Sequence, residues 1–218
     1  MTKPFCRLYL VSPAVTDPRA FAPVLKAACA AGDVAAVLLR LVTDDERAAV
    51  NIVKDLAPIV QDAGAALIVA GPAAVAVRGG ADGAHLDIRS MEEPAGVLED
   101  AASQLRPQRI LGVGGLKSRH IAMQAGEADV DYVMFGEPRP DGSIPPASET
   151  LERAGWWAAI FSIPCVAFAP TLDDVGPLAA AGVEFVALGD AAWTHPAGPA
   201  AAISEALASI AANVPAEP

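Results

Sequence analysis

The stretch LIVAGPAAVAVRGGADGAHLDIRSM, residues 67–91, contains one complete strand–helix–strand unit. Its first three residues are apolar and predict a short buried strand. Gly71-Pro72 predicts a turn that starts a helix, because proline fits the first helical turn, and Gly79-Gly80 predicts the end of that helix. Residues 82–86 then start a second strand. Two parallel strands joined by a crossover helix are the unit from which parallel sheets are built.

The same unit recurs along the whole chain of 218 residues. Apolar runs predict eight strands, each followed by a helical pattern, and the runs begin near residues 7, 36, 67, 83, 109, 132, 165 and 185. The strands are continuously apolar rather than alternating, which is typical of a parallel sheet covered on both faces. Eight such units at this length predict a single (β/α)8 TIM barrel. An open doubly wound sheet is the alternative, and the even count of eight full units disfavours it.

The barrel is expected to occupy residues 1–212, followed by a short C-terminal tail at residues 213–218. Three of the expected strands are preceded by the same pattern, an acidic residue followed by an apolar run. The acids are Asp82, Asp131 and Glu184. Each lies where a helix has just ended and the chain turns inward to the next strand.

Composition limits the classes of function. No apolar run reaches the ~20 residues that a membrane helix needs, and the N-terminus lacks a charged segment followed by an apolar signal core. A cytoplasmic protein without membrane contact is expected. The net charge of −11 argues against a nucleic-acid partner, since such binding depends on Lys and Arg neutralising phosphates. Cys6, Cys29 and Cys165 have no disulfide or metal-ligand spacing and are interpreted as small buried hydrophobes.

In a barrel of this type, function lies in the loops after the C-terminal ends of the strands. These loops carry Arg40, Asp87, Glu137 and Asp190, together with Asp141. Such carboxylates with Arg40 could bind a metal or perform acid–base chemistry, or they could be solvated loop acids. Arg40 directly follows apolar strand residues, so it is expected either to bind ligand or to form an ion pair with Asp87 or Asp190.

The histidines give weaker signals. His85 lies inside an expected strand and is interpreted as a satisfied core residue rather than a catalyst. His195 follows Trp193 in the last top-face loop, where a ligand could meet both side chains. No nucleophile with a neighbouring base is evident for it in the sequence.

Beyond these patterns, the chain resembles the thiamine phosphate synthase and thiazole tautomerase family. Residues 67–91 are similar to the family segment LIINDRVDLALAVGADGVHLGQEDM. LYLV at 8–11, VLLRLV at 37–42, ILGVG at 110–114, DYVMFG at 131–136 and IPCVA at 163–167 are similar to the family's LYLVTD, VQLREK, IIGVS, DYVGFG and IPVVAIGG, in the same order. The resemblance covers nearly the whole chain, and scaffold positions carry most of it.

This resemblance implies a transferase of thiamine biosynthesis that joins hydroxymethylpyrimidine diphosphate to thiazole phosphate, with magnesium assisting the departure of pyrophosphate. At the family's two metal carboxylates this chain has Gly71 and Ser90, so no metal ligand and no cofactor is evident from the sequence. Of the family's substrate-binding residues, Arg40 matches and Ser143 is a near match. The tautomerase's catalytic His falls on Leu116, so tautomerase activity is not expected.

The phosphate-binding positions also differ from the family pattern. Ala169-Pro170 replaces two glycines whose amides hold the thiazole phosphate in the family, and proline has no N–H to donate. Asp190 stands at the other wall of that cradle, where a carboxylate would repel a phosphate.

Three functions follow from the sequence. The first is the family's synthase reaction. The second is a catalytically degenerate barrel that binds a small ligand or a protein partner. The third is a repurposed enzyme that uses the top-face carboxylates and Arg40 on another substrate. In each case a small-molecule ligand is expected in the barrel mouth, and a homodimer is left open.

Overall fold

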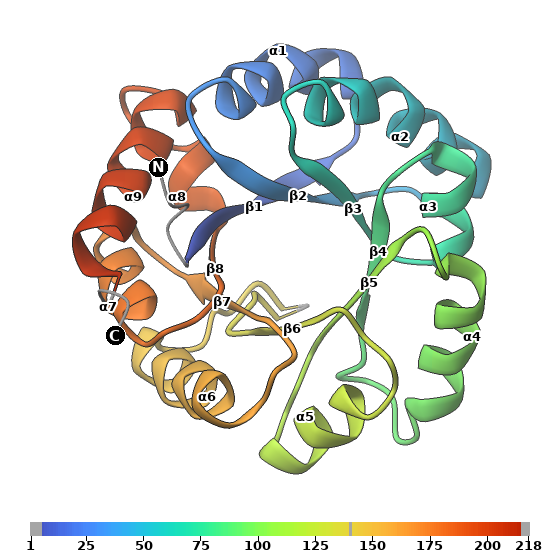
Figure 1. Cartoon of the computed structure of the whole chain (residues 1–218). Coiled ribbons are helices and arrows are strands. Elements are labelled where there is room, and N and C mark those ends of the chain that lie inside the picture. Colours follow the sequence, from blue (N-terminus) through green and yellow to red (C-terminus); the bar gives the residue numbers. More distant parts are fainter. Residues whose placement is uncertain (1–5, 140, 215–218) are drawn as a thin grey trace.

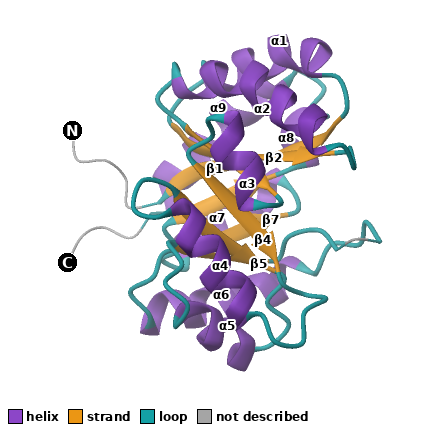
Figure 2. Ribbon diagram, turned by 90° about the vertical axis from the view of Figure 1, so that its right-hand side faces the viewer, coloured by secondary structure: helices purple, strands orange, loops and turns teal. Residues whose placement is uncertain are grey.

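A computed structural model describes residues 6–139 and 141–214. Eight parallel strands pair in sequence order and close into one barrel, with β8 beside β1 (Figure 1). Helices surround this barrel, as a (β/α)8 architecture requires, and the predicted fold class is confirmed. In a second view, the long loop that follows the sixth strand projects from one end of the barrel (Figure 2).

The strands are β1 (Arg7–Val15), β2 (Val34–Leu41), β3 (Ala66–Ala70), β4 (Gly83–Asp87), β5 (Ile110–Gly114), β6 (Tyr132–Phe135), β7 (Cys165–Ala169) and β8 (Phe185–Leu188). The helices are α1 (Pro18–Cys29), α2 (Glu46–Gln61), α3 (Ala73–Gly79), α4 (Ala95–Leu105), α5 (Arg119–Gly126), α6 (Ala147–Ile160), α7 (Val175–Ala180), α8 (Asp190–Trp193) and α9 (Pro199–Asn213), with a 3₁₀ turn at Leu172–Asp174. Residues 215–218 of the expected tail lie outside the described residues.

Local features set the boundaries of several elements. Thr43 and Glu46 have the spacing of a capping box, but the Asp45 side chain caps α2 by accepting the Arg47 N–H. Strand β1 continues past Ser12-Pro13. It bulges there and pairs with β2 again at Ala14 and Val15. The bulge is held by the Ser12 hydroxyl, which accepts the Arg40 backbone N–H at 2.9 Å.

Two further helix boundaries also have local features. Helix α4 begins at Ala95, with Pro94 at its N-cap position. The segment after β7 contains the 3₁₀ turn first and then α7. Helix α8, four residues long, lies where a loop was expected.

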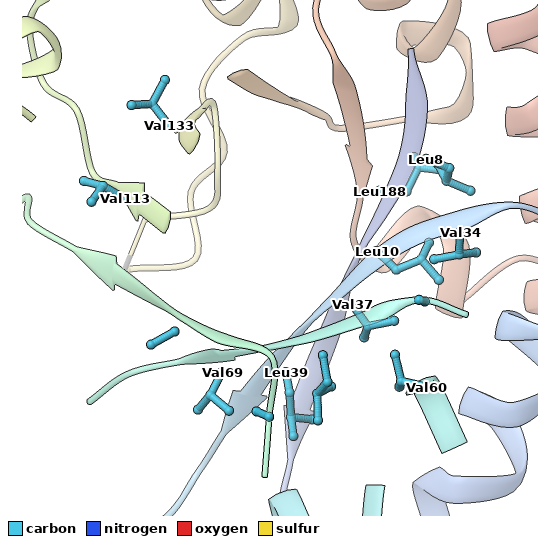
Figure 3. Packing of buried hydrophobic residues seen from close by; sticks show 14 of the residues in the cluster. Leu8, Leu10, Val34, Val37, Leu39, Val60, Val69, Val113, Val133 and Leu188 are labelled. Atoms are coloured by element: carbon cyan, nitrogen blue, oxygen red, sulfur yellow. The ribbon is translucent and has the colours of Figure 1, made fainter. Parts of the chain in front are cut away.

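The buried apolar side chains form two groups because successive residues of a strand point to opposite faces. One group lies between the strands and the surrounding helices, and Leu8, Leu10, Val37 and Leu39 belong to it (Figure 3). The other group fills the barrel lumen with Tyr9, Val11, Ala36, Leu38, Ile68, Tyr132, Met134, Val166, Phe168 and Ala187. The interior of the barrel is therefore packed, and a ligand site has to lie at its mouth.

The three pre-strand acids share one structural role. The carboxylate of Asp82 accepts the Leu67 N–H at 2.7 Å, and that of Asp131 accepts the Leu111 N–H at 2.7 Å. Glu184 does the same for the Cys165 N–H at 2.8 Å. Each acid thus fixes the first residues of the strand preceding its own, which sets the relative height of two neighbouring strands.

Replacing Asp131 by Ala should lower the free energy of unfolding by about 2–3 kcal/mol, because Leu111 N–H and the Arg106 guanidinium both lose a charged acceptor. Glu152→Ala is the control, since its ion pair with Arg119 is exposed on both sides and should contribute less than ~1 kcal/mol. Urea unfolding of both variants measures the difference. Equal midpoints for the two variants would contradict the strand-fixing role.

The three cysteines are buried and free, as predicted. Burial raises the pKa of all three thiols, which leaves them unreactive. No helix in residues 6–139 and 141–214 is long and apolar enough to cross a membrane.

Candidate functional site at the barrel mouth

A pocket of about 310 Å³ opens among the loops that follow β4, β5 and β6. It is lined by Arg89, Gly115, Leu116, Lys117, Gly136, Glu137, Arg139, Pro145, Glu149 and Arg153. The loops come from the C-terminal ends of three neighbouring strands, which is where barrel enzymes place their sites. The pocket is off the barrel axis, beside α6.

Basic side chains outnumber acidic ones in this mouth pocket. Arg153 is paired with Glu149 at 2.8 Å, one helical turn away, and its Nη1 also donates to the Leu116 carbonyl at 2.9 Å. Lys117 and Arg139 form no ion pair within the part of the chain that the structure describes. Arg139 donates to the Ser143 hydroxyl, and its charge helps to lower the pKa of Asp141 in the same loop. With four basic and two acidic side chains in its lining, the pocket is locally positive on a protein of net charge −11. Its charge suits an anionic ligand.

The Arg89 guanidinium bridges two carboxylates, those of Asp87 and Glu137. Its Nε lies 2.8 Å from a carboxylate oxygen of Asp87, and its Nη2 lies 3.5 Å from Glu137 Oε1. Nη2 also donates to the Pro138 carbonyl at 3.3 Å. The Arg89 side chain is only 16% exposed, so the loops after β4 and β6 are joined by a largely buried cation.

Glu137 is the most enclosed carboxyl group of the pocket, with a side chain 14% exposed. Burial raises its pKa. Hydrogen bonds from the backbone, including one from the Gly115 N–H, together with the charge of Arg89 oppose that rise. A carboxyl group with a raised pKa can carry a proton closer to neutral pH than an exposed glutamate can, which is a requirement for a general acid.

A chain of buried polar groups lies behind Glu137. The hydroxyls of Tyr9 and Tyr132 are 2.9 Å apart, and the Tyr132 hydroxyl is 2.9 Å from Nδ1 of His85. His85 Nε2 lies 2.7 Å from the point where a Cβ of residue 114 would be, and Glu137 Oε1 lies closer still to that point. Because residue 114 is glycine, the carboxyl and the imidazole share this space. His85 is a satisfied interior residue, as predicted, and burial lowers its pKa to about 4.

Arg40 lies at the mouth end of the lumen, on the same face of β2 as Ala36 and Leu38. Its expected ion pair with Asp87 or Asp190 does not form. Asp87 is bound to Arg89 instead, and Arg40 has no ion pair with any residue in 6–139 or 141–214. The partly exposed guanidinium is therefore available to a ligand at the mouth.

The other sequence candidates are separated from one another. The Ser143 hydroxyl donates to Asp141 at 2.7 Å in an exposed loop, and hydrogen bonds from Ser143 lower the pKa of that carboxyl. Asp190 is exposed at the start of α8. His195 lies 3.8 Å from Glu205 and accepts the Ala197 N–H at Nδ1, so its ring faces α9. Of the carboxylate candidates, only Asp87 and Glu137 are brought together, by Arg89.

The donor set does not fit the magnesium that the resemblance implies. Gly71 and Ser90 offer no carboxylate at the two family positions, Asp87 is held by Arg89, and Glu137 is enclosed with a raised pKa. Among the described residues, no three His, Cys, Asp or Glu side chains lie close enough together to hold a metal ion. Magnesium coordination needs oxygen ligands that these positions do not supply.

Sequence reasoning missed the basic residues of the pocket. Arg89 could have been found, because it lies two residues after Asp87 in a top-face loop. Arg153 could not, because it lies on the second turn of α6 and reaches the mouth only through helix packing. Lys117 carries no local signal beyond its position just after β5.

The family model described as thiamine monophosphate synthase matches residues 8–192. The chain belongs to this family. A thiamine-phosphate synthase of Rhodospirillum centenum is 40% identical over 202 residues, covering 92% of this chain and 95% of the relative. One of Hyphomonas neptunium is 36% identical over 211 residues and covers 92% of each chain. The resemblance seen in the sequence motifs is thereby confirmed.

Solved structures agree with the thiamine monophosphate synthase family at the level of the fold. A thiamine phosphate pyrophosphorylase from Pyrococcus furiosus superimposes with a TM-score of 0.75 at 20% identity, covering 96% of this chain and 97% of that one. A (S)-3-O-geranylgeranylglyceryl phosphate synthase from Thermoplasma acidophilum gives 0.67 at 16% identity, covering 94% and 92%.

Proposed function

We propose that this protein catalyses the reaction of its family, joining hydroxymethylpyrimidine diphosphate to thiazole phosphate, at the mouth of the barrel. The observation that supports this is the mouth pocket, in which Lys117 and Arg139 have no ion pair among the described residues. Both substrates are anionic, and a pocket whose basic side chains outnumber its acidic ones, on a protein of net charge −11, concentrates such ligands. Arg40 at the rim of the lumen would contact the part of the substrate that extends over the barrel axis.

The test is to incubate the purified protein with both substrates and magnesium, and in parallel with EDTA, and to measure thiamine phosphate. Product at an ordinary enzymatic rate is the expected result in at least one condition. No product in either condition, from protein that binds the diphosphate substrate, would rule out the proposed reaction.

A second candidate is ligand binding without turnover. It is favoured by the losses around the mouth, where Gly71 and Ser90 replace the family's carboxylates and Pro170 removes an amide donor. The same assay separates the two candidates. A protein that binds the substrates tightly and releases them unchanged fits this second function.

A cytoplasmic location and a homodimer belong to this proposal as well. The family's substrates are small phosphorylated metabolites, and the acidic chain has no membrane-spanning helix among the described residues. Light scattering on the purified protein measures its molecular mass in solution. A mass equal to that of a single chain would contradict the dimer.

A further inference from the structure

We propose that the mouth pocket holds a diphosphate group without magnesium, with basic side chains neutralising its charge and Glu137 supplying a proton to the leaving oxygen. This inference rests on the proposed function, because the diphosphate is the leaving group of that reaction. Two observations support a site without a metal ion. The carboxylates that would hold a metal are missing, and cations that could replace its charge are present.

The cations come from four separate parts of the chain and line one pocket. Arg89 follows β4, Lys117 follows β5 and Arg139 lies in the loop after β6, and all three line the pocket. Arg153 approaches from α6 and is fixed by Glu149 and the Leu116 carbonyl. Guanidinium and ammonium groups around phosphate oxygens stabilise a leaving group as charge develops on it.

The start of α6 supplies further donors beside these cations. Pro146 is the N-cap residue and makes no side-chain cap, so the first N–H groups of this 14-residue helix have no capping side chain. Glu149 and Arg153, one and two turns further on, line the pocket, so this helix end borders it. The partial positive charge of a helix N-terminus favours phosphate.

An unpartnered hydroxyl lies close to the same place. Thr150 is 1% exposed, and its Oγ1 has no hydrogen-bond partner among the described residues. It lies directly against Gly136, which lines the pocket. A buried hydroxyl without a partner is uncommon. The Thr150 hydroxyl occupies the space that a Cβ at residue 136 would fill, so it lies directly behind the wall of the pocket.

Glu137 is placed to carry the proton. Its carboxyl lines the pocket, accepts the Gly115 N–H, and is joined to Asp87 through Arg89. Tyr132 and His85 face it from the interior. The arrangement in which Tyr9 donates to Tyr132 and Tyr132 donates to His85 Nδ1 uses both hydroxyl protons within the described residues. The proton of His85 is then on Nε2, which faces the carboxyl of Glu137 across the space left by Gly114.

The step balances as follows. The bond between the pyrimidine methylene carbon and the diphosphate oxygen breaks, and its electron pair stays on that oxygen. The thiazole nitrogen forms the new C–N bond with its lone pair. Glu137 takes up a proton from solvent when the diphosphate binds, and the leaving oxygen takes that proton. The carboxylate that remains is stabilised by Arg89 and the Gly115 N–H. The Nε2–H of His85 adds a further favourable dipole to that carboxylate.

The test measures binding of inorganic diphosphate by titration calorimetry in EDTA, in two buffers of different ionisation enthalpy. Wild-type protein should bind, and Lys117→Ala should raise the Kd at least ~10-fold, whereas Lys54→Ala on the exposed face of α2 should not. Across a pH series, wild-type protein should take up more protons on binding than Glu137→Gln. This excess is the contribution of Glu137, because protonation of diphosphate itself is common to both proteins.

Binding that requires magnesium, equal proton uptake by the two proteins, or equal affinity of the two lysine variants would each overturn the inference. The result for the metal-free site can be distinguished from the result for the proposed function. Thiamine phosphate formed only with magnesium would refute the metal-free site and leave the reaction standing. Metal-free diphosphate binding with Glu137-dependent proton uptake, but no product in any condition, would establish the site and refute the reaction.

Discussion

Lowering the pH from 7 to 4.5 should destabilise this protein by about 2 kcal/mol through His85 alone. Burial lowers the pKa of His85 from 6.5 to about 4 in the folded state, while the unfolded chain binds a proton near pH 6.5. The stability that this histidine contributes is therefore complete above pH 6.5. It is lost progressively as the pH falls toward 4, because His85 binds a proton in the unfolded state, whereas burial disfavours the charged imidazole in the folded state. Urea unfolding across this range measures the slope.

His85→Asn isolates this effect. The asparagine carbonyl can accept the Tyr132 hydroxyl as Nδ1 does, so the local hydrogen bond is kept while the titration is removed. The wild-type protein should lose more stability than this variant between pH 6.5 and 4.5. His120→Asn, at an exposed position on α5, should follow the wild-type curve. Parallel curves for the wild type and His85→Asn would show that the buried imidazole is not the acid-sensitive group.

Replacing Arg89 by Met should lower the free energy of unfolding by about 2–3 kcal/mol at neutral pH, because Glu137 would be left as an enclosed carboxylate without its cation. Arg78→Met removes an ion pair with Glu46 that is more than half exposed on both sides, so it should cost less than ~1 kcal/mol. Methionine keeps the apolar stem in both variants. Chemical unfolding of the two variants gives the comparison directly.

The pH dependence of the Arg89→Met variant gives a second reading of the same site. The difference in free energy of unfolding between the wild type and this variant should become smaller as the pH falls, because a protonated Glu137 carries no charge for the guanidinium to neutralise. A deficit that stays constant down to pH 5 would mean that lost packing of the arginine stem, and not the buried charge, causes the destabilisation.

The pre-strand acids illustrate how far the sequence reaches into the fold. The sequence shows the repeated pattern at Asp82, Asp131 and Glu184, but it does not show which N–H groups these carboxylates bind. Each carboxylate bonds an N–H that lies 15–20 residues earlier in the chain, at Leu67, Leu111 and Cys165. Hydrogen bonds of this span depend on strand register, which no local pattern specifies.

The candidate site was predicted less completely than the fold. The rule that barrel loops carry function placed Asp87 and Glu137 on the correct face, and the structure joins them through Arg89. The expected partner Arg40 is separate from them. The cations that line the mouth pocket come from three loops and from the second turn of a helix, so their convergence depends on how α6 packs beside β6.

The sequence by itself determined the barrel and the family, because hydrophobic periodicity and turn residues are local properties that recur eight times, and the motifs lie in the scaffold. The glycine at 71 and the serine at 90, where the resemblance implies metal carboxylates, can also be read from the sequence directly. Only the tertiary structure decided which side chains come together in the mouth pocket. A glycine at 114 lets Glu137 and His85 occupy one space, and Lys117, Arg139 and Arg153 meet above it. Electrostatic interactions act through space over a few ångströms, so the charge of the site depends on side chains that the chain order keeps far apart.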